Sequence, residues 1–263
     1  MNIILFAMAA LGGMGLLFGI GLSYAGNKFK VDEDPLIDTL LEILPGVNCG
    51  ACGFPGCRSF AQALLNNVTD PTDCPVGGNN MIQAIGAALG IEVKEIVECR
   101  AFIRCASGKS KSNFHYEYHG MNDCSAAMLM AAGGAKTCSY GCLGGGSCVE
   151  ACDFDAIVME DGIAKVLDEK CAACVKCVAA CPKDLIVMVP KGSEVRVACN
   201  ARDEAKVVRA NCKVGCINCK LCVRACGEDA IHVDNLLAEV DYDKCTNCGE
   251  CVKKCPTKCI VEV

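Results

Sequence analysis

Cysteine is the residue type through which this chain can do chemistry. The chain has 26 cysteines among 263 residues, and most stand in clusters with two or three residues between neighbours. Thiolates spaced this closely suit shared metal centres, because disulfide scaffolds are usually short secreted chains. Zinc and iron–sulfur clusters both accept four thiolates. The pattern therefore predicts several metal centres and leaves a disulfide framework as the weaker alternative.

Two runs have the C-x2-C-x2-C-x3-C-P spacing of bacterial [4Fe–4S] ferredoxins. They are "CAACVKCVAACP" at 171–182 and "CTNCGECVKKCP" at 245–256, and "CINCKLCVRAC" at 216–226 lacks only the proline. Residues 141–182 align with residues 215–256 without a gap, and each segment contains a predicted strand, turn and strand. The chain is therefore predicted to hold two ferredoxin-like units in tandem.

The fourth cysteine of each run in a two-cluster ferredoxin ligates the other cluster, and this rule assigns the ligands. It gives three complete sets, which are Cys171, Cys174, Cys177 with Cys152, Cys245, Cys248, Cys251 with Cys226, and Cys216, Cys219, Cys222 with Cys255. A fourth set, Cys142, Cys148 and Cys181, lacks one ligand because Gly145 aligns with Cys219.

Cys138 is the nearest candidate for the missing ligand. It aligns with Cys212, however, and the complete second unit does not need Cys212. A three-iron cluster beside Gly145 and a ligand from outside the unit therefore remain alternatives to Cys138.

Another four cysteines precede these units in a C-x2-C-x4-C-x16-C pattern, at Cys49, Cys52, Cys57 and Cys74. Glycines between the first three allow the backbone to wrap a metal centre with its amides directed at sulfur. Zinc ribbons favour two separated C-x2-C pairs, so this spacing is closer to plant-type iron–sulfur proteins. It predicts a further [4Fe–4S] cluster, with zinc as the alternative.

Five more cysteines are tentative ligands: Cys99, Cys105, Cys124, Cys199 and Cys212. The first three, with Cys138 or a cysteine of the second unit, are enough for one more cluster. The similarity of "VECR" and "VACN" predicts that Cys99 and Cys199 are equivalent positions ahead of the two units. The cofactor prediction is therefore at least five [4Fe–4S] clusters, with a sixth if these cysteines bind metal.

The remaining candidate metal ligands are expected to serve the surface or the core. His115 and His119 lie four residues apart with tyrosines between them, which favours a loop or hairpin surface over a metal site. Cys259, in a predicted C-terminal strand, is expected to be a buried small hydrophobe.

A membrane anchor is predicted over residues 1–26. Residues 3–25 carry no formal charge, and about 20 residues suffice to cross a bilayer as a helix. Lys28 and Lys30 follow at once, which predicts a single-pass helix in the cytoplasmic membrane with its N-terminus outside and the cluster domains in the cytoplasm. A cleaved signal peptide is the alternative, but no positive segment precedes the apolar stretch.

The predicted fold class is α+β, with this single transmembrane helix, a small helical iron–sulfur module and two ferredoxin-like units. Apolar spacing over 32–45 predicts a short amphipathic helix that ends at a Pro-Gly pair. The expected domains after the anchor are an iron–sulfur module (27–92), a cysteine-containing insert (93–137), a first unit (138–192) and a second unit (193–263).

The charge distribution offers one candidate for a partner surface. The net charge of −6 excludes a globally basic nucleic-acid binder. Seven acids lie in 150–170, whereas seven bases lie in 196–224, namely Arg196, Arg202, Lys206, Arg209, Lys213, Lys220 and Arg224. Two solvated faces are the simpler interpretation. The alternative is that the basic stretch is a docking surface for an acidic electron carrier.

An apolar N-terminus, the "CGACGFPGC" module and ferredoxin motifs, in that order, resemble one family over essentially the whole chain. It is the B subunit of the Rnf complex, a membrane-bound, ion-translocating ferredoxin–NAD oxidoreductase. The doubled ferredoxin unit and the "VECR" insert resemble the longer clostridial-type form, whereas Gly145 and the additional cysteines depart from a member with one ferredoxin unit.

The resemblance implies an electron-transfer subunit without a substrate-converting site of its own. Reduced ferredoxin would deliver electrons, which would pass through the clusters toward the Rnf-type A and E membrane subunits, the D and G flavin subunits and the NAD-reducing C subunit. We expect the basic stretch to receive ferredoxin and the N-terminal cluster to be the exit. Alternatives are a subunit of another membrane redox enzyme, such as a hydrogenase or dehydrogenase, and a zinc-bound scaffold. The sequence does not decide between sodium and proton transport.

Overall fold

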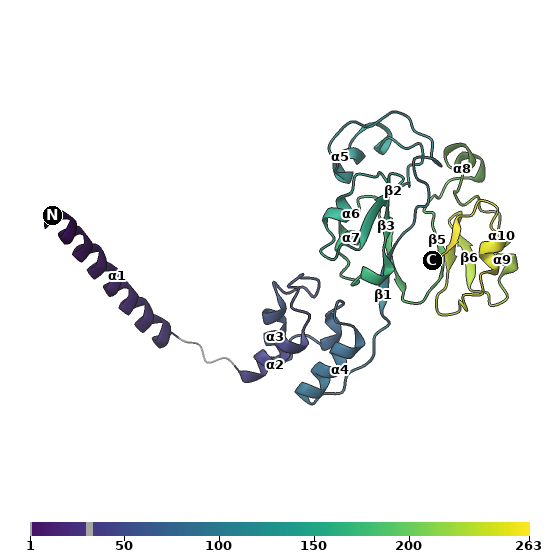
Figure 1. Cartoon of the computed structure of the whole chain (residues 1–263). Coiled ribbons are helices and arrows are strands. Elements are labelled where there is room, and N and C mark those ends of the chain that lie inside the picture. The colour runs from purple at the N-terminus through teal and green to yellow at the C-terminus, as the bar shows by residue number, and fades with distance from the viewer. Residues whose placement is uncertain (1, 30–33) are drawn as a thin grey trace.

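The computed structural model describes residues 2–29 and 34–263 (Figure 1). Lys30 and the first two residues of the predicted helix over 32–45 lie outside the described residues. The first helix, α1, covers Asn2–Lys28. Over the part of the chain that the structure describes, no helix has the length and hydropathy required of a membrane span. The anchor over residues 1–26 stays a prediction.

A small helical module follows, built from α2 (Pro35–Ile43), α3 (Cys57–Leu65) and α4 (Gly78–Leu89). Asp34 caps α2 by accepting a hydrogen bond from the Leu36 amide at 3.0 Å, and Pro35 occupies the first helical position, where its missing N–H costs nothing. The three helices bury one apolar face each, and Leu40, Phe60 and Ile82 are at most 1% exposed. This core holds the cysteine loop that precedes α3.

The two ferredoxin-like units each contain an antiparallel hairpin and two short helices at aligned positions. In the first unit β2 (Ile157–Glu160) pairs with β3 (Ile163–Val166), beside α6 (Ser147–Glu150) and α7 (Lys176–Ala179). In the second unit β6 (Ile231–Asp234) pairs with β7 (Leu237–Val240), beside α9 (Leu221–Ala225) and α10 (Glu250–Lys254). The mixed helix and strand content agrees with the predicted α+β class.

Each unit has a second two-stranded sheet, whose partner strand precedes the cysteine motifs. β1 (Cys99–Ile103) pairs with β4 (Ile186–Pro190), and β5 (Val195–Val197) pairs with β8 (Ile260–Glu262), both antiparallel. Part of the predicted insert therefore supplies a strand to the first unit. In Figure 1 the second unit, in yellow, lies beside the first, and helices α2–α4 lie below the first.

Strand register corrects one predicted equivalence. Ile103 lies opposite Ile186 and Val197 lies opposite Ile260, while 186 and 260 are aligned positions of the two units. Two residues beyond these strands stand Cys105 and Cys199, so Cys105, and not Cys99, is the counterpart of Cys199. Local similarity between "VECR" and "VACN" misled the prediction because strand pairing, which the sequence does not display, sets the alignment.

The remaining short elements are η1 (Pro71–Asp73), α5 (Cys124–Met128), η2 (Ala131–Gly133), η3 (Asp168–Lys170) and α8 (Ala205–Asn211). The chain between β1 and α6 touches both units. The Ser110 hydroxyl donates to the Asp161 carboxylate in the hairpin of the first unit at 2.6 Å, and Ser112 forms an isolated bridge with Cys212 of the second unit. This segment therefore lies over the junction of the two units and brings its cysteines there.

Candidate metal centres

The structure gathers the cysteines into six groups of four, which we number as sites. All 26 thiols are free, so no disulfide competes for them in the described chain. Site 1 is Cys49, Cys52, Cys57, Cys74; site 2 is Cys152, Cys171, Cys174, Cys177; site 3 is Cys124, Cys142, Cys148, Cys181. Site 4 is Cys105, Cys138, Cys199, Cys212; site 5 is Cys216, Cys219, Cys222, Cys255; site 6 is Cys226, Cys245, Cys248, Cys251.

Sites 1, 2, 5 and 6 bring together the same cysteines that motif spacing groups. Each fourth cysteine crosses to the other motif of its unit, so Cys152 lies with Cys171 and Cys226 lies with Cys245. The structure thus juxtaposes these four sets, while metal ligation by them stays a prediction.

Site 3 contains a cysteine that motif spacing did not select. Cys124, Cys142, Cys148 and Cys181 line one cavity, and the Cys148 thiol is within electrostatic reach of the other three. Cys138, the nearest candidate by sequence, lines a different cavity. The structure therefore offers a ligand from outside the motif, one of the alternatives that the spacing left open.

Local hydrogen bonds fix Cys124 at the start of α5. Its amide donates to the Ser147 hydroxyl at 2.8 Å, and that hydroxyl donates to the Asp123 carboxylate at 3.3 Å. Asp123 also caps α5 by accepting from the Ala126 amide at 2.6 Å. The N-terminal end of α5 is thereby tied to α6, the helix that carries Cys148.

Site 4 lies at the junction of the two units, and each unit supplies two of its cysteines. Cys105 and Cys199 are the aligned residues beyond β1 and β5, and Cys138 and Cys212 are aligned in the ungapped overlay. The site therefore has approximate two-fold symmetry. It unites three of the five tentative ligands with Cys138, in a combination that sequence reasoning did not assemble because all four lie outside the motifs.

Backbone amides point at the sulfurs around these sites. The amides of Ala156, Leu185 and Ala230 donate to the sulfurs of the cysteines four residues earlier at 3.3–3.5 Å. At site 4, the Cys216 amide donates to Cys199 Sγ at 3.2 Å and the Cys142 amide to Cys105 Sγ at 3.5 Å. Hydrogen bonds to sulfur stabilise thiolates and reduced clusters.

The cluster loops hold residues in the left-handed region of backbone conformation. Val175 and Lys220 have φ of 57° and 55°, and Ala173 and Asn218 have φ of 58° and 53°. A β-branched residue such as Val175 is rarely found there, so surrounding structure must hold the loop. Turns of this kind aim successive amides at an anionic centre.

Burial disfavours free thiolates in these cavities. It raises the pKa of Cys148 to about 12 and the pKa values of Cys177, Cys199 and Cys222 to about 11, and neighbouring sulfurs add to the shift. Four converging thiolates therefore need cationic metal to be stable. Donor number and thiolate chemistry both fit [4Fe–4S] clusters.

Two cysteines lie outside the six groups. The thiol of Cys99, the first residue of β1, donates a hydrogen bond to the Val97 carbonyl at 3.4 Å. Cys259 is 2% exposed, as expected of a buried small residue, but its sulfur also lies 3.6 Å from that of Cys255 at site 5. A hydrogen bond from the Cys259 thiol lowers the pKa of Cys255 to about 5.

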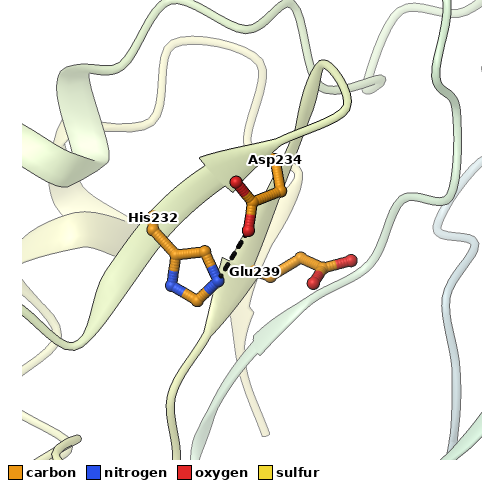
Figure 2. A group of neighbouring side chains, drawn as sticks. All are labelled: His232, Asp234 and Glu239. Atoms are coloured by element: carbon orange, nitrogen blue, oxygen red, sulfur yellow. Dashed lines mark ion pairs between the residues drawn. The ribbon is translucent and has the colours of Figure 1, made fainter.

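The histidines provide no comparable site in the described chain. His115 and His119 are exposed, as predicted, and His119 lies 3.6 Å from the Glu117 carboxylate. His232, Asp234 and Glu239 form a group in the second hairpin (Figure 2). His232 pairs with Asp234 at 3.2 Å, as the dashed line in Figure 2 marks, whereas Glu239 pairs with Arg104 and Arg202 at 3.5 and 3.7 Å. We assign no metal there.

A large cavity, about 930 Å³, lies between the insert and the glycine loop 144–146. No cysteine is among the described residues that line it. The hydroxyls of Tyr116 and Tyr118 donate to carbonyls of the insert itself at 3.0 and 3.1 Å. These two hydroxyls are thus satisfied within the insert, and we assign no ligand to the cavity.

The paired hairpins and converging thiolates define an iron–sulfur protein. In agreement, residues 44–76 match a putative Fe-S cluster family, and residues 215–259 match the 4Fe-4S dicluster domain family. The chain is 45% identical to the B subunit of the ion-translocating oxidoreductase complex of Methanosarcina acetivorans, over 98% of both chains. It is 46% identical to the B subunit of the Na⁺-translocating ferredoxin:NAD⁺ oxidoreductase complex of Acetobacterium woodii, over 99% of this chain and 78% of that one.

A third relative, the B subunit of the proton-translocating ferredoxin:NAD⁺ oxidoreductase complex of Clostridium ljungdahlii, is 38% identical over 99% of this chain and 93% of its own length. The chain therefore belongs to the family of B subunits of ion-translocating ferredoxin:NAD⁺ oxidoreductase complexes, the Rnf type. This family includes the clostridial-type subunits. It is a subunit of an oxidoreductase complex. These full-length matches confirm the family resemblance and do not favour a hydrogenase subunit or a zinc scaffold.

Proposed function

We propose that this subunit accepts electrons from reduced ferredoxin at its second unit and relays them through six [4Fe–4S] clusters to the membrane and flavin subunits of the complex. Bound clusters would supply one-electron transfer at each site. The observation that carries this proposal is that the six cysteine sites form one unbroken series through the described chain.

The successive sites lie near one another along the described chain. Cys49 of site 1 is within electrostatic reach of Cys174 of site 2. Sites 2 and 3 exchange ligands within the first unit, and sites 5 and 6 do so within the second. Site 4 joins the units, because hydrogen bonds from the Cys142 and Cys216 amides reach its sulfurs. The order is therefore 6, 5, 4, 3, 2, 1.

The electron-accepting end is proposed at sites 5 and 6. Cys219 and Cys248 are exposed, unlike the cysteines of the other sites. The same unit carries the remaining bases of the predicted docking stretch, Lys206, Arg209, Lys213, Lys220 and Arg224, which form no ion pair with the described residues. Unpaired surface cations steer acidic partners, which is the charge complementarity that the proposed ferredoxin would need.

Two bases of that stretch have other partners. Arg196 is 3% exposed and forms two hydrogen bonds with the Asp168 carboxylate, and its guanidinium carbon lies 5.4 Å from the centre of the Phe102 ring. Arg202 pairs with Glu239 at 3.7 Å. The docking proposal therefore rests on the other five bases alone.

The exit end is proposed at site 1, in the module that follows α1. The charge-free run over 3–25 supports a membrane anchor there, with the N-terminus outside and the cluster sites in the cytoplasm. An anchored site 1 would meet the Rnf-type A and E subunits, with the D, G and C subunits further along. The relatives' names include both Na⁺ and proton transport, so the transported ion stays open.

Interrupting the series at site 4 tests the relay. In Cys138→Ala/Cys212→Ala, ferredoxin should still reduce sites 5 and 6 quickly, while sites 1–3 should lag by at least about tenfold. Cys99→Ala, outside all six groups, is the matched control. Equal reduction of all remaining clusters in the double variant would contradict the proposed order.

A further inference from the structure

Buried polar residues are rare in this chain, and two of them lie at site 4. Ser107, Lys136 and Arg196 are the buried polar or charged residues of the described chain, at 6%, 6% and 3% exposure. Arg196 is neutralised by Asp168. Ser107 and Lys136 instead line the cavity of Cys105, Cys138, Cys199 and Cys212.

Lys136 brings a positive charge to this cavity. Its Nζ donates to the Ser107 carbonyl at 2.6 Å, and no carboxylate of the described residues lies within ion-pair distance of it. Arg104, the other base lining the cavity, pairs with Glu239 at 3.5 Å. A buried cation requires an anionic partner, and a cluster with four thiolates is anionic in both oxidation states.

Ser107 lies on the same side of the cavity, where the free Cys212 thiol donates a hydrogen bond to its Oγ. Its Oγ lies 3.1 Å from Cys212 Sγ and 2.6 Å from the Ser112 hydroxyl. The Ser112 hydroxyl also donates to the Ser107 carbonyl at 3.0 Å. A metal-bound Cys212 thiolate can only accept a hydrogen bond, so the Ser107 hydroxyl can turn its one proton to that sulfur. The hydroxyl and the ammonium group thus favour negative charge on the metal site.

These groups break the approximate symmetry of site 4. Lys136 aligns with the exposed Ala210 of the second unit, and Ser107 corresponds to Ala201. Lys136 reaches inward past Gly141, where a Cβ would stand 3.3 Å from its Cδ. Only the side of the first unit therefore carries this charge and this hydroxyl.

We propose that Lys136 and Ser107 raise the reduction potential of the cluster at site 4, so that an electron passing between the two units resides on this cluster. Reduction adds one negative charge, which a buried cation and a donated hydrogen bond stabilise. An electron that has left the second unit then rests at the junction rather than returning. This inference rests on the proposed presence of a cluster at site 4.

Potentiometric titration of the full chain, followed by electron paramagnetic resonance, tests it. The site 4 signal is identified as the component lost in Cys138→Ala/Cys212→Ala. At the potential that half-reduces site 4 in the unaltered protein, Lys136→Met should lower its reduced-to-oxidised ratio about tenfold, and Ser107→Ala about threefold.

Lys136→Arg keeps the charge and should stay within about twofold, as should Lys111→Met, which removes an exposed lysine of the same segment. An unchanged ratio in Lys136→Met with full iron, or equal losses in Lys136→Arg and Lys136→Met, would overturn the inference. If Lys136→Met fails to retain iron, the reduced-to-oxidised ratios of the other two variants decide. A threefold lower ratio in Ser107→Ala with a nearly unchanged ratio in Lys136→Arg supports the inference, and an unchanged ratio in Ser107→Ala overturns it. Absence of any site 4 signal in the unaltered protein would instead reject the cluster itself.

Discussion

The backbone of Cys124 occupies the space that a side chain at Gly145 would need. A Cβ at Gly145 would lie 2.8 Å from the Cys124 amide nitrogen and 2.8 Å from the preceding carbonyl carbon. The second unit has Cys219 at the aligned position. The glycine at position 145 and the cysteine at position 124 therefore depend on each other, because Cys124 can reach site 3 only where residue 145 has no side chain.

Replacing Cys124 should damage site 3 alone. In Cys124→Ser we expect the cluster to be lost or converted to a three-iron form, because three strong thiolate ligands remain. Iron analysis and electron paramagnetic resonance would measure this. Cys138→Ser should leave site 3 intact and affect site 4, and a three-iron signal at site 3 in that variant would contradict the grouping.

Returning the motif cysteine should not repair site 3. Gly145→Cys places a side chain against the backbone of residues 123 and 124, so we expect destabilisation by about 1–3 kcal/mol and displacement of α5. Thermal unfolding would measure it, with Gly227→Ala as control, since no atom lies within 4 Å of a Cβ built there. Equal stability of both variants would contradict this prediction, because it would show that the insert moves away from a side chain at position 145 at no cost in stability.

Metal content should follow the six groups. Full occupancy corresponds to about 24 iron atoms per chain, and five clusters to about 20. Cys99→Ala should retain the full amount, whereas Cys212→Ala should lose about four atoms. Anaerobic iron, sulfide and zinc analysis of the full chain checks this. Zinc in place of iron would contradict the electron-transfer proposal.

Reversing charge at the proposed ferredoxin surface should slow ferredoxin oxidation. Lys206→Glu/Arg209→Glu/Lys213→Glu removes three unpaired cations, so we expect a rate at least about tenfold lower at low salt and a weaker dependence on ionic strength. Lys94→Glu/Lys165→Glu, outside the basic stretch, is the control. Stopped-flow mixing with reduced ferredoxin would measure both, and unchanged rates in the triple variant would reject the docking surface.

The Arg196–Asp168 pair, in which the guanidinium is buried and the carboxylate half-buried, should stabilise the association of the two units. Arg196→Ala removes its hydrogen bonds to Asp168 and its packing on Phe102, and hydrogen bonds to charged groups typically contribute about 1.5–3 kcal/mol. Denaturant unfolding of the cluster-loaded chain would measure the loss. The exposed pair Lys253–Glu250 is a matched comparison, since solvent screens it and Lys253→Ala should cost much less. Equal losses in the two variants would contradict a stabilising role for the Arg196–Asp168 pair.

Local motifs predicted most of the sites because their ligands lie close in sequence. The spacing rule grouped Cys152 with the 171–177 run without any knowledge of tertiary structure. Cys124 and site 4 were not grouped, because their members come from separate segments that only tertiary contacts bring together: hydrogen bonds to α6 for Cys124, and strand pairing for Cys105 and Cys199. Arg196 was counted as a surface charge because a charge count does not register burial.

Site 4 also has a consequence for how the protein is made. Cys105 and Cys138 emerge during synthesis well before Cys199 and Cys212, so the first unit alone presents only half of the ligands. Insertion of this cluster must therefore wait until the second unit has been translated and folded against the first. A truncated or misfolded second half would leave the junction without metal, which links biogenesis of the electron path to completion of the whole chain.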